Sequence, residues 1–223
     1  MGQQQRGARA EIAPARLQIL LGLGAATIFE AQGQKGAISP AIRAVDPGMR
    51  LVGRALTVTS RPGDNLMLHF AIDRASPGDV LVVDCGGFLD AGVWGDIMTL
   101  CAQQRGIAGL VVDGAVRDTA SLAAMGFPVF SRGVCIKDTT KNQAGEINVP
   151  LDFCGVRIEP GDVIVGDRDG LVLVQQNDVE RAIQVSLDRE AKEEGVRAKI
   201  RAGQSTLQIM GLEKQVRELG IKG

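Results

Sequence analysis

Apolar residues follow two patterns along most of the chain, one typical of strands and the other typical of helices. Residues 80–84 and 107–112 are nearly continuous apolar runs, as expected of strands buried on both faces. From Trp94 onward, between these runs, apolar residues return at helical spacing. A strand, a helix and a second strand in this order predict a parallel pair.

The same unit recurs further along the chain. Residues 119–125 predict a short helix, and residues 127–130 predict the strand that follows it. Residues 163–165 and 171–174 then predict two strands joined as a hairpin around the turn 167–170. The sheet is therefore expected to be partly parallel.

The N-terminal part predicts helix before strand. Residues 15–32 read as short helical stretches interrupted by glycines, and residues 55–59 alternate as a strand should. Asp64 is placed to cap a helix that runs to about Ala75.

The end of the chain predicts further helices. Asn177 and Glu180 have the spacing of a capping box and open a helix with one apolar face. Ser205 and Gln208 form a second capping pair. This apolar face exceeds what one small core needs, so we expect it to pack on a neighbouring subunit.

These elements predict an α/β fold with two parts. Residues 1–175 are expected to form the catalytic core around a central sheet, and residues 176–223 a helical extension that contacts a partner subunit. A chain of 223 residues with 45% hydrophobic content is long enough to bury one substantial core.

Charge and hydropathy narrow the possible partners. Lys and Arg total 25 against 26 Asp and Glu, and no basic block stands out, so nucleic acid is not expected as a direct partner. The apolar runs are far shorter than the roughly 20 residues that span a bilayer. Residues 1–10 lack the apolar stretch of a secretory signal, so we expect a cytoplasmic protein.

Cysteine and histidine usage limits metal chemistry. Cys85, Cys101, Cys135 and Cys154 form no CxxC pair and are expected to be reduced core thiols. The single histidine, His69, cannot build a His-rich site. Any metal must therefore use oxygen ligands.

Two segments after predicted strands carry the candidate chemistry, because ligands of parallel sheets bind beyond the carboxyl ends of strands. Residues 85–96 are expected to form a long loop whose glycines let the main chain approach a carboxylate. Asp96, Arg117 and Asp118 together offer two carboxylates and one cation, which suit a hard divalent ion and an anionic substrate. A 2-oxo acid can chelate Mg²⁺ or Mn²⁺, and Arg117 can then stabilise an enolate.

Each of these residues also has a purely structural explanation. Asp118 is a good helix N-cap, and Arg117 can form an ion pair with Asp113. The glycines of residues 85–96 can simply make turns. Local pattern leaves both interpretations open.

Gly95-Asp96 and Arg117-Asp118, separated by 20 residues, resemble the signature of the 4-hydroxy-4-methyl-2-oxoglutarate / 4-carboxy-4-hydroxy-2-oxoadipate aldolase family. The same superfamily includes the regulator of ribonuclease activity A. The resemblance covers most of the chain, through residues 27–36, 53–58, 62–69, 78–96, 114–118, 126–133 and 160–162. It implies a compact α-β-β-α sandwich, homotrimers or homohexamers, and class II aldolase chemistry with Mg²⁺ or Mn²⁺.

The resemblance also implies roles for single residues. Asp118 would hold the metal, Arg117 would bind the pyruvate carboxylate or keto oxygen and steady the enolate, and Asp96 would orient a metal-bound water. A Glu from the C-terminal helix of a neighbouring subunit would assist, with Glu193 or Glu194 as the candidate. Backbone N–H groups would bind the substrate carboxylate, from Gly92, Val93, Trp94 and Gly95.

One position departs from the family pattern. The family's aldolases often carry an acidic residue three positions after the Arg-Asp pair, and here that position is Ser121. The departure lowers the expected metal affinity and catalytic rate, and it leaves the expected fold unchanged.

Three functions follow from these residues and the resemblance. The first is pyruvate release from 4-hydroxy-4-methyl-2-oxoglutarate or 4-carboxy-4-hydroxy-2-oxoadipate, with oxaloacetate decarboxylation through the same enolate. The second is a non-catalytic regulator that binds an RNA-degrading enzyme. A Schiff-base aldolase is the third, but Lys35, Lys137 and Lys141 lie in polar or glycine-rich contexts that keep an amine protonated.

Overall fold

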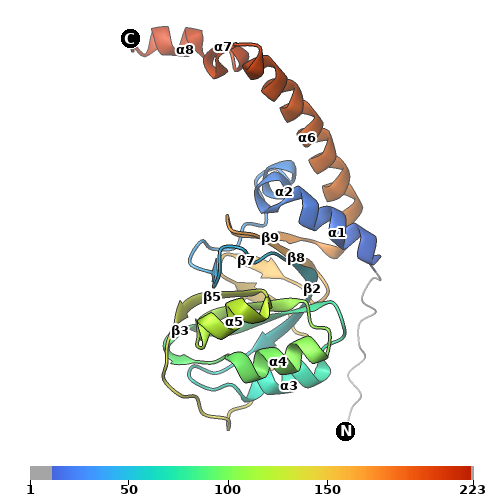
Figure 1. Ribbon diagram of the computed structural model, residues 1–223, viewed down its shortest axis with the longest axis vertical. Helices are drawn as coiled ribbons and strands as arrows, with labels where there is room; N and C mark the ends of the chain where they lie inside the picture. The colour runs from blue at the N-terminus through green and yellow to red at the C-terminus, as the bar shows by residue number, and fades with distance from the viewer. Residues whose placement is uncertain (1–11, 222–223) are drawn as a thin grey trace.

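A mixed seven-stranded sheet lies at the centre of the computed structural model, which describes residues 12–221 (Figure 1). The strand order is β1-β5-β4-β3-β2-β8-β9. The middle four strands pair in parallel, and β1, β8 and β9 pair antiparallel with their neighbours. The bounds are β1 Arg43–Ala44, β2 Leu51–Thr59, β3 Asp79–Gly92, β4 Gly109–Val116, β5 Val129–Val134, β8 Val163–Gly166 and β9 Leu171–Val174. The predicted parallel pairing and the predicted hairpin are confirmed; the expectation about residues 1–10 lies outside the described residues.

Three helices connect the parallel strands and lie together on one side of the sheet (Figure 1). They are α3 (Leu66–Arg74), α4 (Asp96–Gln104) and α5 (Thr119–Met125), the last with the predicted bounds. Leu68, Ala102 and Leu122 are fully buried, one from each helix. These helices therefore form the outer α layer on this side.

The hairpin β8–β9 lies at one edge of the sheet and separates two cores. Ile164 and Leu173 point into the main core, whereas Val165 and Val172 pack into a second core with α1 (Pro14–Leu23), α2 (Ala25–Ala31) and the start of α6 (Val179–Arg201). This alternation is the two-residue period of a strand buried on both faces. The short hairpin of β6 (Leu151–Phe153) and β7 (Val156–Ile158) also packs on the main core. The α-β-β-α order is confirmed.

The C-terminal helices extend away from these layers (Figure 1). The first turns of α6 bury Val179, Ala182 and Ile183, and the chain continues through α7 (Thr206–Ile209) and α8 (Glu213–Glu218). The capping box of Ser205 and Gln208 is confirmed. The capping box expected at Asn177 is wrong, because this residue lies in the 3₁₀ turn Gln176–Asp178 and α6 has no side-chain cap. The division of the chain at residue 175 stays a prediction.

Two other expectations need correction. The loop predicted over residues 85–96 is mostly strand, because β3 runs to Gly92 with two shifts in its register to β4. Gly86 and Gly87 have positive φ, so they bend the strand instead of ending it. Cys101 is exposed on α4, and of the four free thiols only Cys85 is fully buried.

The expected cap of α3 is also shifted. Asn65 is at the N-cap position but its side chain makes no capping hydrogen bond, while Asp64 Oδ1 accepts from the Leu66 N–H at 2.9 Å. Asp64 thus accepts a hydrogen bond from the first residue of the helix, although it lies one position before the N-cap. None of the helices in residues 12–221 is long and apolar enough to cross a membrane.

Candidate functional site

The first side of the site is the turn from β3 into α4. Gly92 donates its N–H to Lys137 O at 3.0 Å, and Val93 donates its N–H to Ala115 O at 2.9 Å. These two amides are therefore already used by the fold. Within residues 12–221, the N–H groups of Trp94 and Gly95 donate to no other residue. They are the two expected backbone donors that remain for an anion.

Buried side chains hold this turn in place. Trp94 is 1% exposed, stacks on Phe127 with ring centres 6.2 Å apart, and donates from Nε1 to Thr99 Oγ1 at 2.7 Å. Val93 is fully buried. Since neither side chain reaches solvent, these two residues can serve a ligand only through the main chain.

The second side is the turn from β4 into α5. Arg117 donates its N–H to Trp94 O at 2.8 Å, which ties the two turns together. Asp118 has φ 57° and ψ 34°, a left-handed conformation that costs free energy for a residue with a Cβ. Its side chain makes no capping hydrogen bond to α5. The interpretation of Asp118 as a simple N-cap is therefore wrong.

The Asp118 carboxylate instead faces the first turn. Its Oδ2 accepts from the Asp96 N–H at 3.3 Å and lies 3.5 Å from Arg117 Nε. A Cβ on Gly95 would lie 2.3 Å from this same oxygen, so any larger residue would displace the Asp118 carboxylate. Gly95 has an extended backbone, which shows that it is needed for close approach and not for a turn.

The guanidinium of Arg117 lies between two carboxylates. Nη1 donates to Asp138 Oδ1 at 2.9 Å, and Nε faces Asp118. The alternative pairing of Arg117 with Asp113 is wrong, because Asp113 binds Arg132. Asp138 was not singled out from the sequence: it follows β5 in an irregular segment whose residues have no helical or strand period.

The site is half-open and supplies only oxygen ligands. The side chains of Arg117 and Asp118 are 41% and 37% exposed, and Asp96 Oδ1 accepts from the Ile97 N–H at 2.7 Å. In the described part of the chain, no group of three or more His, Cys, Asp or Glu residues could enclose a metal. Asp118 with Asp96 nearby fits an ion that keeps most of its waters, as Mg²⁺ does. Ser121 is exposed on the first turn of α5 and adds no charge.

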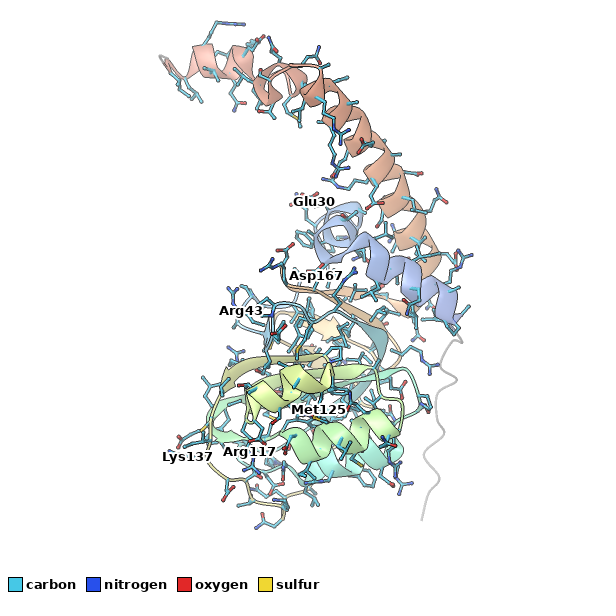
Figure 2. All side chains as sticks on the ribbon, in the orientation of Figure 1. Glu30, Arg43, Arg117, Met125, Lys137 and Asp167 are labelled. Atoms are coloured by element: carbon cyan, nitrogen blue, oxygen red, sulfur yellow. The ribbon has the colours of Figure 1, made fainter. Side chains whose placement is uncertain are left out.

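The predicted glutamates lie elsewhere in the chain. Glu193 pairs with Arg189 and Arg197, each at 3.0 Å, and Arg189 also contacts Glu30. Figure 2 shows Glu30 and Arg117 at well-separated parts of the molecule. Hydrogen bonds from Arg201 and Arg197 lower the pKa of Glu194. One chain therefore does not bring either glutamate to Arg117, and their delivery by a neighbouring subunit stays a prediction.

The structure does not support the hypothesis of a Schiff-base aldolase that uses a lysine. Lys137 pairs with Asp90, and this hydrogen bond raises the pKa of the Lys137 amine. A raised pKa keeps the amine protonated, whereas a Schiff-base lysine must be neutral to attack a carbonyl. His69 lies exposed on α3.

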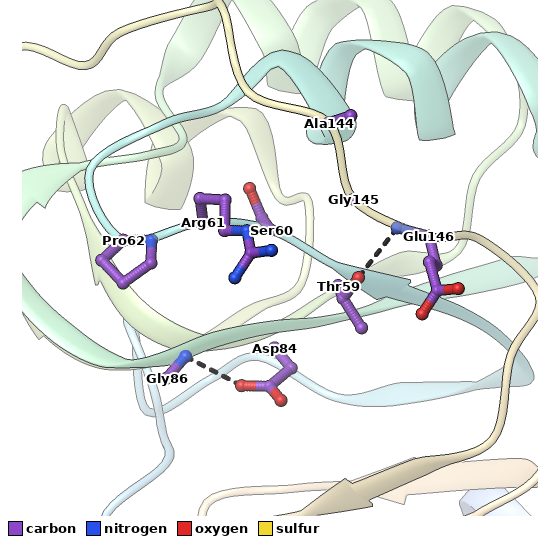
Figure 3. Close-up of a pocket in the computed structure, with 9 residues that line it drawn as sticks. All are labelled: Thr59, Ser60, Arg61, Pro62, Asp84, Gly86, Ala144, Gly145 and Glu146. Atoms are coloured by element: carbon purple, nitrogen blue, oxygen red, sulfur yellow. Dashed lines mark hydrogen bonds between the residues drawn. The ribbon is translucent and has the colours of Figure 1, made fainter.

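A separate cleft of about 490 Å³ lies at the carboxyl end of β2, beside the middle of β3 (Figure 3). One wall is the backbone near Glu146, whose N–H donates to Thr59 Oγ1 at 2.8 Å. Its lining contains none of the predicted site residues and comprises Thr59, Ser60, Arg61, Pro62, Asp84, Gly86, Ala144, Gly145 and Glu146.

Comparison with known proteins relates this chain to one family. The RraA-like profile, described as Aldolase/RraA, matches residues 25–173. A protein of Halalkalibacterium halodurans named "Putative 4-hydroxy-4-methyl-2-oxoglutarate aldolase" is 38% identical over 177 residues, which cover 78% of this chain and 84% of the relative.

Solved structures agree with this family. An uncharacterized protein from Pseudomonas syringae pv. tomato has a TM-score of 0.77 and 34% identity, covering 88% of this chain and 97% of that one. The RNA-processing inhibitor RraA from Thermus thermophilis has a TM-score of 0.62 and 30% identity, covering 67% of this chain and 90% of that one.

Proposed function

The chain belongs to the RraA-like (Aldolase/RraA) family, and on that basis we propose that it is a carbon–carbon lyase that releases pyruvate from 4-hydroxy-2-oxo acids. The observation that carries the proposal is the convergence of Asp96, Arg117 and Asp118. Asp118 takes a strained left-handed backbone and leaves its helix uncapped, so that its carboxylate faces Asp96 and Arg117. Strain of this kind is typical of functional sites.

The proposed substrates are 4-hydroxy-4-methyl-2-oxoglutarate and 4-carboxy-4-hydroxy-2-oxoadipate. The Trp94 and Gly95 N–H groups and the Arg117 guanidinium would bind the carboxylate next to the keto group. Loss of the proton from the C4 hydroxyl lets the C3–C4 bond break, and its electron pair moves toward the C2 keto oxygen. Arg117 stabilises the negative charge that develops there. Protonation of C3 then gives pyruvate, and Asp96 is the group proposed to exchange this proton.

A divalent ion fits the oxygen donors of this site. Asp118 would hold it, and a bound Mg²⁺ or Mn²⁺ would supply Lewis-acid stabilisation of the same developing charge. Ser121 in place of an acidic residue supports weak binding of this ion. Oxaloacetate decarboxylation is proposed as a companion activity, because it passes through the same pyruvate enolate.

The proposal includes a homotrimer or homohexamer in which Glu193 or Glu194 of a neighbouring copy completes the site. Large apolar side chains beside Asp96 and Asp138 support such a contact, since Ile97 is 75% exposed and Ile136 is 89% exposed.

A pyruvate-release assay tests the proposed reaction. Purified full-length protein is mixed with each of the two hydroxy-oxo acids and with oxaloacetate, and pyruvate is followed through lactate dehydrogenase. We expect release with Mg²⁺ or Mn²⁺, loss of release with chelator, and recovery when metal is restored. Absence of pyruvate from all three compounds at saturating metal would disprove the lyase proposal.

A second candidate function is regulation of an RNA-degrading enzyme. It is favoured by the 30% identity to the RNA-processing inhibitor RraA, whose fold this chain shares. The charged cluster of Asp96, Arg117 and Asp118 supports the lyase instead, because a surface that only binds a protein has no need of a strained Asp118. Binding to a purified ribonuclease without pyruvate release would reverse this preference.

A further inference from the structure

We infer that Asp138 is a built-in competitor for the Arg117 guanidinium, which an anionic substrate or product must displace. The inference rests on the proposed role of Arg117 in binding a carboxylate. Arg117 Nη1 donates to Asp138 Oδ1 at 2.9 Å. The carboxylate of Asp138 is the same chemical group that a 2-oxo acid would present to this donor, so the two compete for one site.

The contact is exposed enough to open. The Asp138 side chain is 94% exposed and that of Arg117 is 41% exposed. A carboxylate this well hydrated gains little net free energy from an ion pair, so the paired and unpaired states have similar free energies. A substrate carboxylate can therefore replace Asp138 without leaving a buried charge behind.

The chain nevertheless keeps Asp138 close to Arg117. It lies in residues 135–150, the segment between β5 and β6 that we call the strap. On one side of Asp138, Lys137 O accepts from the Gly92 N–H at 3.0 Å. On the other side, Thr140 Oγ1 donates to the buried Asp64 Oδ2 at 2.7 Å. A carboxylate tethered between two anchors acts at an effective concentration in the millimolar range or above.

Competition of this kind weakens the binding of every carboxylate at Arg117. For an exposed pair of ordinary strength, we expect the weakening to be roughly two- to six-fold. The same competition favours release of pyruvate, because Asp138 can occupy the guanidinium as the product leaves. Asp138 thus sets the affinity of the site without taking part in the chemistry.

The Asp138→Asn variant tests this inference by calorimetric titration of the full-length protein. Pyruvate, oxalate and acetate serve as probes at low ionic strength, with and without Mg²⁺. We expect pyruvate and oxalate to bind roughly two- to six-fold more tightly than to the wild type. In an Arg117→Ala background, Asp138→Asn should give no gain.

Asp152→Asn is the matched control. Asp152 is 84% exposed and accepts from Arg157 Nη1 at 3.1 Å, but it lies in β6. Its removal should leave all three affinities unchanged. Thr140→Val loosens one anchor of the strap without altering Asp138, and should tighten binding in the same direction by a smaller factor.

Equal or weaker binding by Asp138→Asn would overturn the inference and make Asp138 a positioning residue for Arg117. The inference would also be overturned if neither protein bound any of the three carboxylates. Failure of the lyase proposal is separable from both results: tighter binding by Asp138→Asn together with no pyruvate release would leave a carboxylate site that does not catalyse the reaction.

Discussion

Two Arg–Asp pairs lie near the carboxyl ends of β4 and β5, and they differ in burial. Asp113 of the Arg132–Asp113 pair is 12% exposed, whereas Asp138 of the Arg117–Asp138 pair is 94% exposed. The hydrogen bond that Arg132 donates to Asp113 raises the pKa of Arg132, although burial opposes the charge. The first pair is thus fixed by the core, and the second is available to a ligand. The same two residue types serve stability in one place and binding in the other.

Breaking the buried pair should have the largest effect on folding. Arg132→Ala leaves Asp113 charged and without its partner, so we expect the free energy of unfolding to fall by about 3 kcal/mol, the low end for a buried pair because Arg132 stays partly exposed. Chemical denaturation measures this. A loss as small as that from Arg157→Ala, which breaks an exposed pair, would contradict the comparison.

Breaking the exposed pair from the arginine side should affect turnover and leave folding nearly unchanged. Arg117→Ala removes the donor that acts on the developing enolate, and we expect turnover to fall at least about 100-fold. Arg117→Lys should also lose most activity, because a lysine ammonium cannot replace the planar guanidinium and its parallel N–H donors. Pyruvate release and denaturation curves measured on the same samples check both statements. Near-normal turnover in either variant would remove Arg117 from the reaction.

Asp118→Asn tests the metal role of Asp118, because it removes the charge and keeps the shape of the side chain. Asn adopts the left-handed backbone of this position as readily as Asp does, so the fold should be kept. The loss of charge should remove most of the response to Mg²⁺, and we expect saturating metal to restore less than about a tenth of wild-type pyruvate release. Metal titration of the activity measures this. Full recovery at high Mg²⁺ would mean that another group holds the ion.

Loosening the strap should have the smallest effect and a defined pH dependence. Burial opposes ionisation of Asp64, but hydrogen bonds from Asn142, Thr140, Leu66 and Gln143 outweigh it and lower its pKa. A lowered pKa contributes stability above the unfolded value of about 4, and that stability is lost as pH falls through the folded pKa. We expect Asp64→Asn to cost about 2 kcal/mol at pH 7 and less as pH falls below about 4. A difference between variant and wild type that is constant from pH 7 to pH 3 would contradict the assignment.

Local periodicity predicted the elements of this fold well where neighbouring residues determine the structure. The helix over residues 119–125 and the parallel pairing of β3 with β4 follow from apolar spacing alone. The extension of β3 to Gly92 did not, because glycines that bend a strand and glycines that end it look alike in a sequence.

The candidate site, like the fold, could be predicted from the sequence only in part. The proximity of Asp96, Arg117 and Asp118 follows from the rule that strand ends meet at one edge of a sheet. The partner of Arg117 could not be read from the sequence, which suggested only Asp113; the path of the strap brings Asp138 to the guanidinium instead. The left-handed backbone of Asp118 could likewise not be read from the sequence, because a residue with a Cβ keeps this conformation only where the surrounding structure holds it.

The position of Trp94 gives this protein a spectroscopic property of its own. The chain has one tryptophan and no tyrosine, so its near-ultraviolet absorbance and its intrinsic fluorescence come almost wholly from one indole ring. The ring belongs to Trp94, the residue directly before Gly95, and it is packed against Phe127. Any anion that settles on the Gly95 amide would therefore change an optical signal that no other residue obscures.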